Sequence, residues 1–279
     1  MPELPEVETV RRALAARLVG RRLTRVEARR PDLRKALPRD LAGRLVGRKI
    51  TGIERRAKYL LLNLDDGHAL IVHLGMSGRM LLYRKPPPPG PHDHVILGVD
   101  DGTFVYFNDA RRFGLMTLAD QNELFRHPLL KDLGIEPLGP GFNAPYLREA
   151  LKNRATTIKA ALLDQHVIAG LGNIYVSEAL FRAGISPRRR ARSLSPDRLA
   201  RLATAICAVL NDAIAAGGST LRDHRRPDGD PGYFQHNFTV YGREGEACPG
   251  CDCDVAATGG IQRIVQAGRA TFYCPRRQR

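Results

Sequence analysis

The sequence predicts an α+β protein, in which an antiparallel β-sandwich with an N-terminal helix is followed by a helical region and a cysteine-rich tail. Residues 49–109 contain several runs of strand-forming residues with no helical crossover between them, as in an antiparallel sheet. Apolar residues recur with helical spacing at the start of the chain and again after residue 150. Four of the five cysteines lie in the last 32 residues.

The first element is expected to be an amphipathic helix that begins at Pro5, because proline suits the first helical position. Apolar residues then follow with helical spacing at Val7, Val10, Leu14 and Leu18. Gly20 supplies a stop signal. Pro2 and Glu3 are therefore predicted to lie just before the N-terminus of a helix.

Strands are predicted within three stretches, "KITGIERRAKYLLLNL", "HALIVHLGMSGRMLLY" and "HVILGV" with "TFVYFND". The tripeptides Asp65-Asp66-Gly67 and Asp100-Asp101-Gly102 are typical of hairpin turns. No internal repeat is apparent. The N-terminal helix and these strands together form the first expected domain, residues 1–130.

A Gly/Pro-rich stretch at residues 131–150 is expected to link this domain to a helical one at residues 151–235. Asn173 is a plausible helix cap, and Ser195-Pro196 opens a long helix that ends near Gly217. Residues 236–279 form the cysteine-rich tail.

The charge of the chain favours a polyanionic partner. Lys and Arg number 44 against 29 Asp and Glu, which gives a formal charge of +15. The alternative is a basic solvated surface without a specific partner. No apolar stretch approaches the roughly 20 residues of a membrane span, and the N-terminus lacks the features of a signal peptide. We therefore expect a cytoplasmic protein that does not bind membranes.

The N-terminal proline is a candidate nucleophile. If Met1 is removed, Pro2 becomes a secondary amine, and an N-terminal amine has an ordinary pKa of about 7.7–8.0, well below that of lysine. The positive end of the following helix lowers this pKa further. Such an amine can attack a sugar carbon and form an iminium, while Glu3 moves protons. The alternative is that a Met-Pro start has no chemical role.

Six motifs together resemble bacterial formamidopyrimidine-DNA glycosylases, which are bifunctional repair enzymes. In chain order they are "MPELPEVETVRR", "RRAKYLLL", "HLGMSGR", "NDARRFG", "GLGNIYVSEALF" and "IVQAGRATFYC". The resemblance spans nearly the whole chain. It implies an N-terminal β-sandwich, a helix-two-turn-helix domain with a loop that caps the lesion, and a zinc-finger-type β-hairpin. It also implies a monomer associated with the nucleoid.

The resemblance assigns four catalytic residues. Pro2 would attack C1′ of the damaged nucleotide, and Glu3 would donate a proton that helps to open the sugar. Lys58 corresponds to a general acid/base that contacts phosphate, although a strand lysine could equally be a plain surface residue. Arg269 corresponds to the finger arginine of the elimination step. Because arginine hardly deprotonates, we expect it to bind phosphate or polarise a leaving group.

A glycosylase must fill the gap that a flipped base leaves in the duplex. The resemblance assigns this wedge to Met76, Arg111 and Phe113. Two apolar side chains can stack in the gap, and an arginine can hydrogen-bond the orphaned base. Without the resemblance, Met76 and Phe113 would be interpreted as core residues.

DNA binding is the second role that the resemblance assigns. The matching residues are His92, Arg111, Arg154, Lys159, Asn173 and Tyr241. A glycine-rich turn before a helix, as in "GLGN", also favours an anion through its backbone N–H groups.

The cysteine tail departs from the family pattern, which has two C-x₂-C pairs. Cys248 and Cys251 form the first pair, but Arg277 stands where the second pair needs a partner for Cys274. Cys253 lies in an unusual insert, so Zn²⁺ could be held by Cys248, Cys251, Cys253 and Cys274. Three cysteines with water or another side chain, or a metal-free hairpin, are the alternatives.

We therefore predict a DNA glycosylase and abasic-site lyase that excises oxidised or ring-opened purines from duplex DNA. The reaction would proceed through an iminium on Pro2 to β- and δ-elimination. One alternative is an enzyme of the endonuclease VIII type, which prefers oxidised pyrimidines. The other is a non-catalytic basic DNA-binding protein on the same scaffold.

Overall fold

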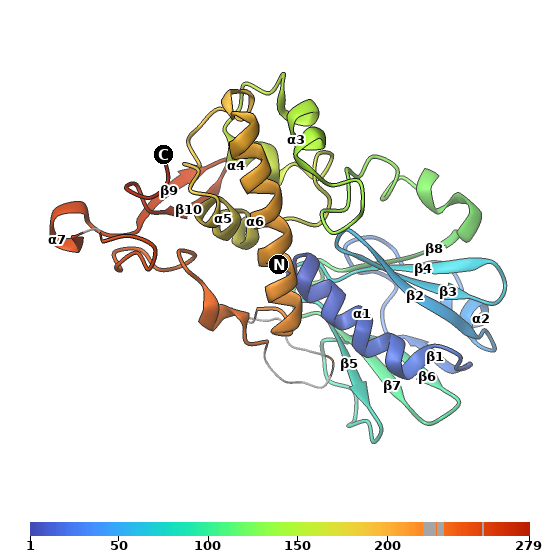
Figure 1. Ribbon diagram of the computed structural model, residues 1–279. Coiled ribbons are helices and arrows are strands. Elements are labelled where there is room, and N and C mark those ends of the chain that lie inside the picture. The colour runs from blue at the N-terminus through green and yellow to red at the C-terminus, as the bar shows by residue number, and fades with distance from the viewer. Residues whose placement is uncertain (220–226, 228–231, 253) are drawn as a thin grey trace. The chain divides into compact units, whose positions relative to one another are not determined.

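The N-terminal part of the chain forms two four-stranded antiparallel sheets, which confirms the prediction made from the missing helical crossovers (Figure 1). One sheet has the strand order β1-β6-β7-β5 and the other the order β2-β3-β4-β8. The strands are β1 Leu23–Ala28, β2 Ile50–Arg56, β3 Tyr59–Leu64, β4 His68–His73, β5 Arg79–Tyr83, β6 Asp93–Val99, β7 Phe104–Asn108 and β8 Leu115–Asp120. The helices here are α1 Leu4–Leu18, α2 Leu41–Leu45 and the 3₁₀ helix η1 Gln121–Arg126.

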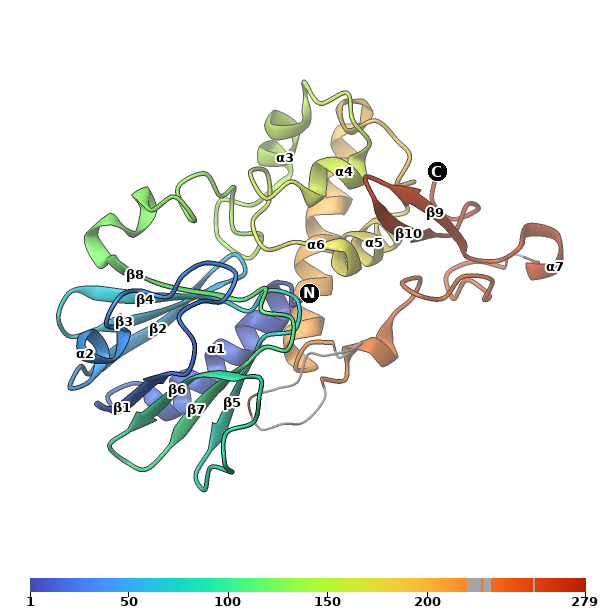
Figure 2. The same ribbon diagram turned by 180° about the vertical axis from the view of Figure 1, so that it is seen from behind.

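The computed structural model describes residues 1–219, 227, 232–252 and 254–279. The chain divides into two compact units, which Figure 2 shows from behind. The first unit comprises residues 1–132 and 214–235, and the second comprises residues 133–213 and 236–279. Residues 133–150, expected to be a linker, thus belong to the second unit, and residues 214–235 group with the N-terminal sheets. The expected lesion-capping loop lies largely outside the described residues.

The core of the first unit lies between its two sheets. Buried side chains from both sheets and from helix α1 form one continuous hydrophobic cluster, which includes Leu14, Val26, Leu62, Val72 and Phe107. Helix α1 begins one residue earlier than expected, at Leu4, with Pro5 in its first turn. Its apolar stripe at Val7, Val10, Leu14 and Leu18 is buried. This packing holds the start of the chain against the sandwich.

The two Asp-Asp-Gly tripeptides form the predicted turns. The first joins β3 to β4, where Gly67 has a φ of +83°, and the second joins β6 to β7, where Gly102 has a φ of +81°. Residues with a side chain rarely adopt such angles, which explains the choice of glycine.

A short internal repeat forms one corner of the sandwich, so the prediction that the chain has none was wrong. Residues 17–24, RLVGRRLT, and residues 44–51, RLVGRKIT, each end a helix and begin a strand. The two copies bond to each other: Gly20 N–H donates to the Ile50 carbonyl at 2.8 Å, and Gly47 N–H donates to the Leu23 carbonyl at 2.7 Å. Each copy thus satisfies backbone groups that the other exposes.

The longer α-helices among the described residues of the second unit are α3 Ala144–Leu151, α4 Ile158–Leu163, α5 Asn173–Arg182 and most of α6 Pro196–Ala215. The turns η2 Ala191–Ser193 and η3 Phe234–Asn237 are 3₁₀ helices, and a short helix α7 spans Val255–Thr258. Helix α6 begins at Pro196, as predicted. Helix α5 is capped by Gly172, so Asn173 is its first residue and not its cap as predicted.

The chain ends in a β-hairpin. Strands β9 Gln262–Gln266 and β10 Arg269–Tyr273 pair antiparallel around a tight turn, Ala267-Gly268. Phe272 and Cys274 pack with Phe181 of α5 and with Val240 and Ile261 in a small hydrophobic cluster. The hairpin is therefore anchored on the second unit near α5.

Within the described part of the chain, none of the helices combines the length and apolar character that a bilayer crossing demands.

Candidate active site and nucleic-acid interface

The start of helix α1 holds the candidate nucleophile and its proton donor. Pro2 is buried, and Glu3 is 4 % exposed at the helix N-cap. The Glu3 N–H donates to the Glu6 carboxylate at 2.8 Å, as in a capping box. The other oxygen of Glu6 accepts from the Ser219 N–H and hydroxyl at 2.8 and 3.0 Å. Glu6 therefore fixes the backbone beside Pro2 and ties it to the segment that follows helix α6.

Lys58 lies in a two-residue turn between β2 and β3 and is 7 % exposed. Ala57, beside it, has a φ of +53°, a conformation unfavourable for a residue with a Cβ atom. Arg55 stabilises this turn, since its guanidinium donates to the Ala57 carbonyl at 2.9 Å. Arg55 also pairs with Glu8 of helix α1 at 3.3 Å. This link connects the turn that presents Lys58 to the helix that begins beside Pro2.

His73 at the end of β4 faces this turn. Its ring lies 4.9 Å from that of Tyr59, and its Nδ1 accepts the Gly75 N–H at 3.0 Å. Burial, followed by the neighbouring cations Lys58 and Arg34, lowers the pKa of His73 to about 4. The imidazole is therefore neutral at pH 7, with its proton on Nε2.

The three predicted wedge residues come from two turns that lie in contact. Met76 follows β4 and is 39 % exposed, whereas Phe113 precedes β8 and is 42 % exposed. The Arg111 guanidinium lies 4.9 Å above the Phe113 ring. Gly75 allows the approach of the two turns, because a Cβ there would lie 2.3 Å from the Phe113 carbonyl carbon. Met76 and Phe113 are thus exposed, unlike the core residues that the alternative interpretation expected.

A fully buried carboxylate, Asp109, holds these two turns together. It accepts from the Ser77 hydroxyl at 2.5 Å and from the Gly114 N–H at 2.7 Å. Ser77 in turn accepts the Arg111 N–H at 3.1 Å. The Asp109 carbonyl bonds to His94 Nε2 at 2.8 Å. The Asp109 side chain therefore bonds to both turns, through Ser77 in one and Gly114 in the other. Ser77 also bonds to the backbone of Arg111.

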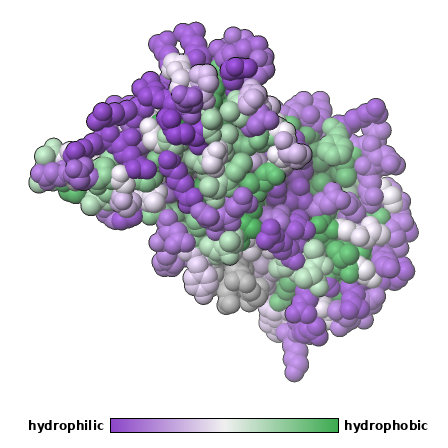
Figure 3. All heavy atoms as spheres, viewed as in Figure 1, coloured by the Kyte–Doolittle hydropathy of each residue, from purple (hydrophilic) through white to green (hydrophobic). Residues whose placement is uncertain are grey.

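His92 lies next to this network and is exposed, and its carbonyl accepts the Asp109 N–H at 2.9 Å. The molecular face drawn in Figure 3 carries hydrophilic residues mainly towards its edges and hydrophobic ones across its middle. An exposed histidine and arginine beside an apolar wedge suit a nucleic acid, whose phosphates bind cations and whose bases stack.

In the second unit, two predicted DNA-binding residues contact the terminal hairpin. Lys159 of α4 is 0 % exposed, and its ammonium donates to the Ala270 carbonyl at 2.8 Å and to the Thr271 hydroxyl at 2.6 Å. Asn173 of α5 donates to the same carbonyl at 2.9 Å. Both side chains thus hold strand β10 next to its first residue, Arg269, which is exposed.

Tyr241 is positioned by a buried glutamate, Glu178. Glu178 of α5 is 0 % exposed, and its carboxylate accepts the N–H groups of Thr239, Val240 and Tyr241 at 2.9, 3.0 and 2.8 Å. The Tyr241 hydroxyl lies 3.4 Å from the Asn173 amide nitrogen. Tyr241, Asn173 and Lys159 are therefore grouped against strand β10.

Arg154 follows α3 and pairs with Asp164 at 2.8 Å, while its Nε donates to the Ala150 carbonyl at 3.2 Å. The pair is partly exposed. Arg154 thus remains at the surface, with its guanidinium oriented by a carboxylate.

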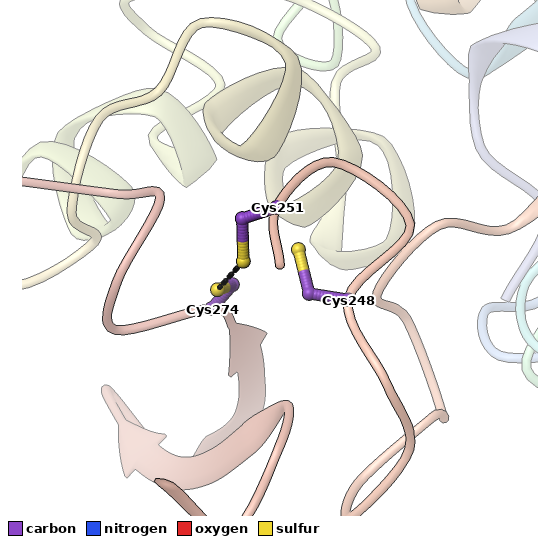
Figure 4. Close-up of side chains that lie close together, drawn as sticks. All are labelled: Cys248, Cys251 and Cys274. Carbon is purple, nitrogen blue, oxygen red and sulfur yellow. Dashed lines mark hydrogen bonds between the residues drawn. The ribbon is translucent and has the colours of Figure 1, made fainter. Parts of the chain in front are cut away.

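Three cysteines converge at the base of the hairpin (Figure 4). The Sγ atoms of Cys248, Cys251 and Cys274 all lie within 4.8 Å of one another, and Cys251 and Cys274 are 3.6 Å apart. Thiolates around a tetrahedral Zn²⁺ are about 3.8 Å apart, given a Zn–S bond of about 2.3 Å. The backbone N–H groups of Gly250 and Arg277 each lie 3.4 Å from a cysteine sulfur, of Cys248 and Cys274 respectively.

These three side chains fit a zinc ion. In the chain without metal, burial raises the pKa of Cys248 to about 12, so ligation would release its proton. The fourth predicted ligand, Cys253, lies outside the described residues. Arg277 occupies the position where the second cysteine pair would be completed.

The fold and the site define a DNA-binding protein, in which exposed apolar and cationic side chains lie on two adjacent turns of a basic chain. Residues 1–116 match the formamidopyrimidine-DNA glycosylase N-terminal domain, and residues 133–225 match the H2TH domain of the same proteins. The chain belongs to the formamidopyrimidine-DNA glycosylase family.

Individual relatives agree over their full length. The formamidopyrimidine-DNA glycosylase of Rhodospirillum rubrum is 59 % identical over 281 residues, which cover 100 % of both chains. A Lactococcus lactis Fpg mutant in complex with Fapy-dG-containing DNA is 38 % identical, with a TM-score of 0.89 and 100 % coverage of both chains. The same enzyme with DNA that contains an abasic site is 37 % identical, with a TM-score of 0.89 and 99 % coverage of both chains.

Four residues of the site were not singled out from the sequence, namely Glu6, His73, Ser77 and Asp109. Each lies inside a quoted motif, but Glu6, Ser77 and Asp109 act through partners distant in sequence, as Glu6 does through Ser219. A polar residue inside an otherwise apolar or glycine-rich motif is the signal that could have found them.

Proposed function

We propose that this chain is a bifunctional DNA glycosylase and abasic-site lyase that excises oxidised or ring-opened purines from duplex DNA in base excision repair. The observation that carries the proposal is the start of helix α1, where Pro2 and the buried Glu3 lie at the helix N-terminus. A basic chain of charge +15 favours the DNA partner.

The reaction begins when Met1 has been removed and the Pro2 nitrogen is a free secondary amine. The amine attacks C1′, the bond from C1′ to the base breaks, and the base leaves with a proton. Glu3 gives a proton to O4′ as the C1′–O4′ bond opens, which leaves an iminium between Pro2 and the sugar. Loss of a C2′ proton then expels the 3′ phosphate, and a second elimination expels the 5′ phosphate. Water hydrolyses the remaining iminium and restores the amine.

The other residues bind and orient the DNA. Lys58 supplies a cation for phosphate and proton transfer, and the exposed Arg269 binds phosphate or polarises a leaving group. Met76, Arg111 and Phe113 fill the gap left by the everted base. His92, Arg154, Asn173 and Tyr241 contribute to the DNA interface, and Lys159 supports it from within the second unit. We expect a monomer that acts in the cytoplasm at the nucleoid, where its substrate is found.

Zn²⁺ is the structural cofactor of this enzyme, and Cys248, Cys251 and Cys274 are the described residues that would hold it. When bound, it cross-links the segments on either side of the hairpin and supplies no chemistry to the sugar. The sequence suggests Cys253 as the fourth ligand.

Borohydride trapping tests the proposal. Protein shown to lack Met1 is incubated with duplex DNA that contains 8-oxoguanine or an abasic site, and borohydride reduces any iminium to a stable adduct. A parallel duplex with an oxidised pyrimidine distinguishes the endonuclease VIII type. We expect a covalent adduct with the oxidised purine and with the abasic site.

Two variants make the result specific. A chain extended at its N-terminus has no free proline amine and should give no adduct. Lys49→Met, which removes an exposed lysine from the same unit, should be trapped like the unaltered protein, whereas Lys58→Met should be trapped more slowly. The absence of an adduct with every substrate would leave the non-catalytic DNA-binding alternative.

A further inference from the structure

The C-terminal finger, residues 248–279, lacks one metal ligand in its second cysteine pair. Cys274 and position 277 have the same spacing as Cys248 and Cys251, but position 277 is an arginine. A guanidinium has five N–H donors and no acceptor, and it stays protonated, so it cannot ligate a metal ion. Arg277 must therefore have a role in the finger other than metal ligation.

Arg277 bonds to the opposite cysteine pair. Its Nη1 donates to the Gly250 carbonyl at 2.6 Å, between Cys248 and Cys251. A Cβ on Gly250 would lie 2.7 Å from the Arg277 guanidinium, so glycine permits this approach. The guanidinium carbon also lies 5.0 Å above the Phe181 ring of α5. One side chain thus joins the first cysteine turn to the helix beneath the finger.

The neighbouring arginine makes a second crossing. Arg276 pairs with the Asp252 carboxylate at 3.1 Å and donates to the Asp252 carbonyl at 3.3 Å. Gln278, which is 2 % exposed, fixes the end of the chain, since its amide donates to the Ile185 carbonyl at 2.9 Å and accepts the Cys274 N–H at 2.8 Å. The arginines therefore extend from an anchored segment.

We propose that Arg277, assisted by Arg276, clamps the Cys248–Cys251 turn to the C-terminal segment and replaces the cross-link that a cysteine at position 277 would make. Three or four thiolates around a dication carry a net negative charge, which the adjacent guanidinium partly offsets. The clamp connects the same two segments as the metal does. The finger therefore keeps its hairpin when the metal is removed.

The test crosses metal removal with loss of the clamp. Full-length wild-type protein and Arg277→Ala are each prepared with zinc and after stripping by excess chelator under reducing conditions. Zinc per chain is measured by colorimetric release, and amide hydrogen exchange is followed in β9 and β10. Arg201→Ala, which removes an exposed arginine from helix α6, is the matched control.

We expect amide exchange in the hairpin of the stripped wild-type protein and of stripped Arg201→Ala to stay within about threefold of the zinc-loaded rate. Exchange in stripped Arg277→Ala should be at least tenfold faster. If the stripped wild type and stripped Arg277→Ala exchange at equal rates, whether slow or fast, the clamp is refuted.

A second variant tests whether a cysteine at position 277 can act as a zinc ligand. Arg277→Cys restores the second C-x₂-C pair, so zinc should leave it at least tenfold more slowly than it leaves the wild type. Removal of zinc from this variant should also speed hairpin exchange, because the clamp is gone. Unchanged zinc release would show that position 277 does not face the metal and would overturn the proposal.

Discussion

Replacement of Asp109 by asparagine is expected to slow the excision of a damaged base far more than cleavage at an abasic site. Asparagine keeps one acceptor oxygen and replaces the other by an NH₂ donor, so either the Ser77 hydroxyl or the Gly114 N–H loses its acceptor. A buried donor without a partner costs about 1–3 kcal/mol. If the inserted wedge is stabilised by about 2 kcal/mol less, the excision rate should be roughly 30-fold lower.

The assay compares two substrates in single-turnover experiments. In the proposed mechanism, excision of 8-oxoguanine requires the wedge to displace a stacked base, whereas a preformed abasic site has no base to evert. The excision rate should fall about 30-fold, and strand cleavage at the abasic site should change by less than about threefold. Ser77→Ala should act in the same direction with a smaller effect.

Asp101→Asn is the control, because Asp101 lies in an exposed turn of the same unit and accepts the Thr103 N–H. This variant should excise at the wild-type rate. If Asp109→Asn slowed both reactions equally, Asp109 would serve overall stability. If it slowed neither, the wedge would not depend on this carboxylate.

Three further predictions concern buried polar groups. His73 has a pKa of about 4 in the folded chain and about 6.5 in the unfolded chain, so the unfolded chain binds more protons between these values. The free energy of unfolding should therefore fall by about 3 kcal/mol as the pH drops from above 6.5 to below 4. In urea unfolding, His73→Asn should reduce this dependence on pH. Glu178→Gln should lower the free energy of unfolding by about 3 kcal/mol, whereas Glu149→Gln on the surface of α3 should change it by less than about 0.5 kcal/mol, as thermal unfolding would reveal. Lys159→Met should slow the elimination step that we propose Arg269 to assist. It should leave the salt dependence of DNA binding unchanged, because the ammonium bonds protein oxygens; a shallower salt slope would instead identify a phosphate contact.

Local signals predicted the sandwich well. The helix at the N-terminus follows from Pro5 and an apolar stripe, and the turns follow from Asp-Asp-Gly, so each depends on neighbours in the chain. Asn173 shows where such signals fail. Its type and position suit a helix cap, but its side chain bonds to Ala270, 97 residues away. A contact of that range leaves no mark in the local pattern.

The candidate site was predicted from motifs that resemble a family, and its supporting residues were not. Met76 and Phe113 were named, but the carboxylate that joins their turns was not, because Asp109 and Ser77 lie 32 residues apart and meet only when β5 and β7 pair. Arg277 shows the reverse case. Its departure from the cysteine pattern was evident in the sequence, and only the structure revealed the carbonyl that it binds.

The paired RLVGR corner bears on the order in which the chain folds. Its two copies are separated by only 27 residues, and each ends a helix with a glycine of left-handed φ, Gly20 at +85° and Gly47 at +82°. Closing a loop of this length costs little more entropy than closing a shorter one. The corner joins β1 of one sheet to β2 of the other, so its early formation would set the relation of the two sheets before most of their strands exist. Mutations there would then slow folding more than they speed unfolding.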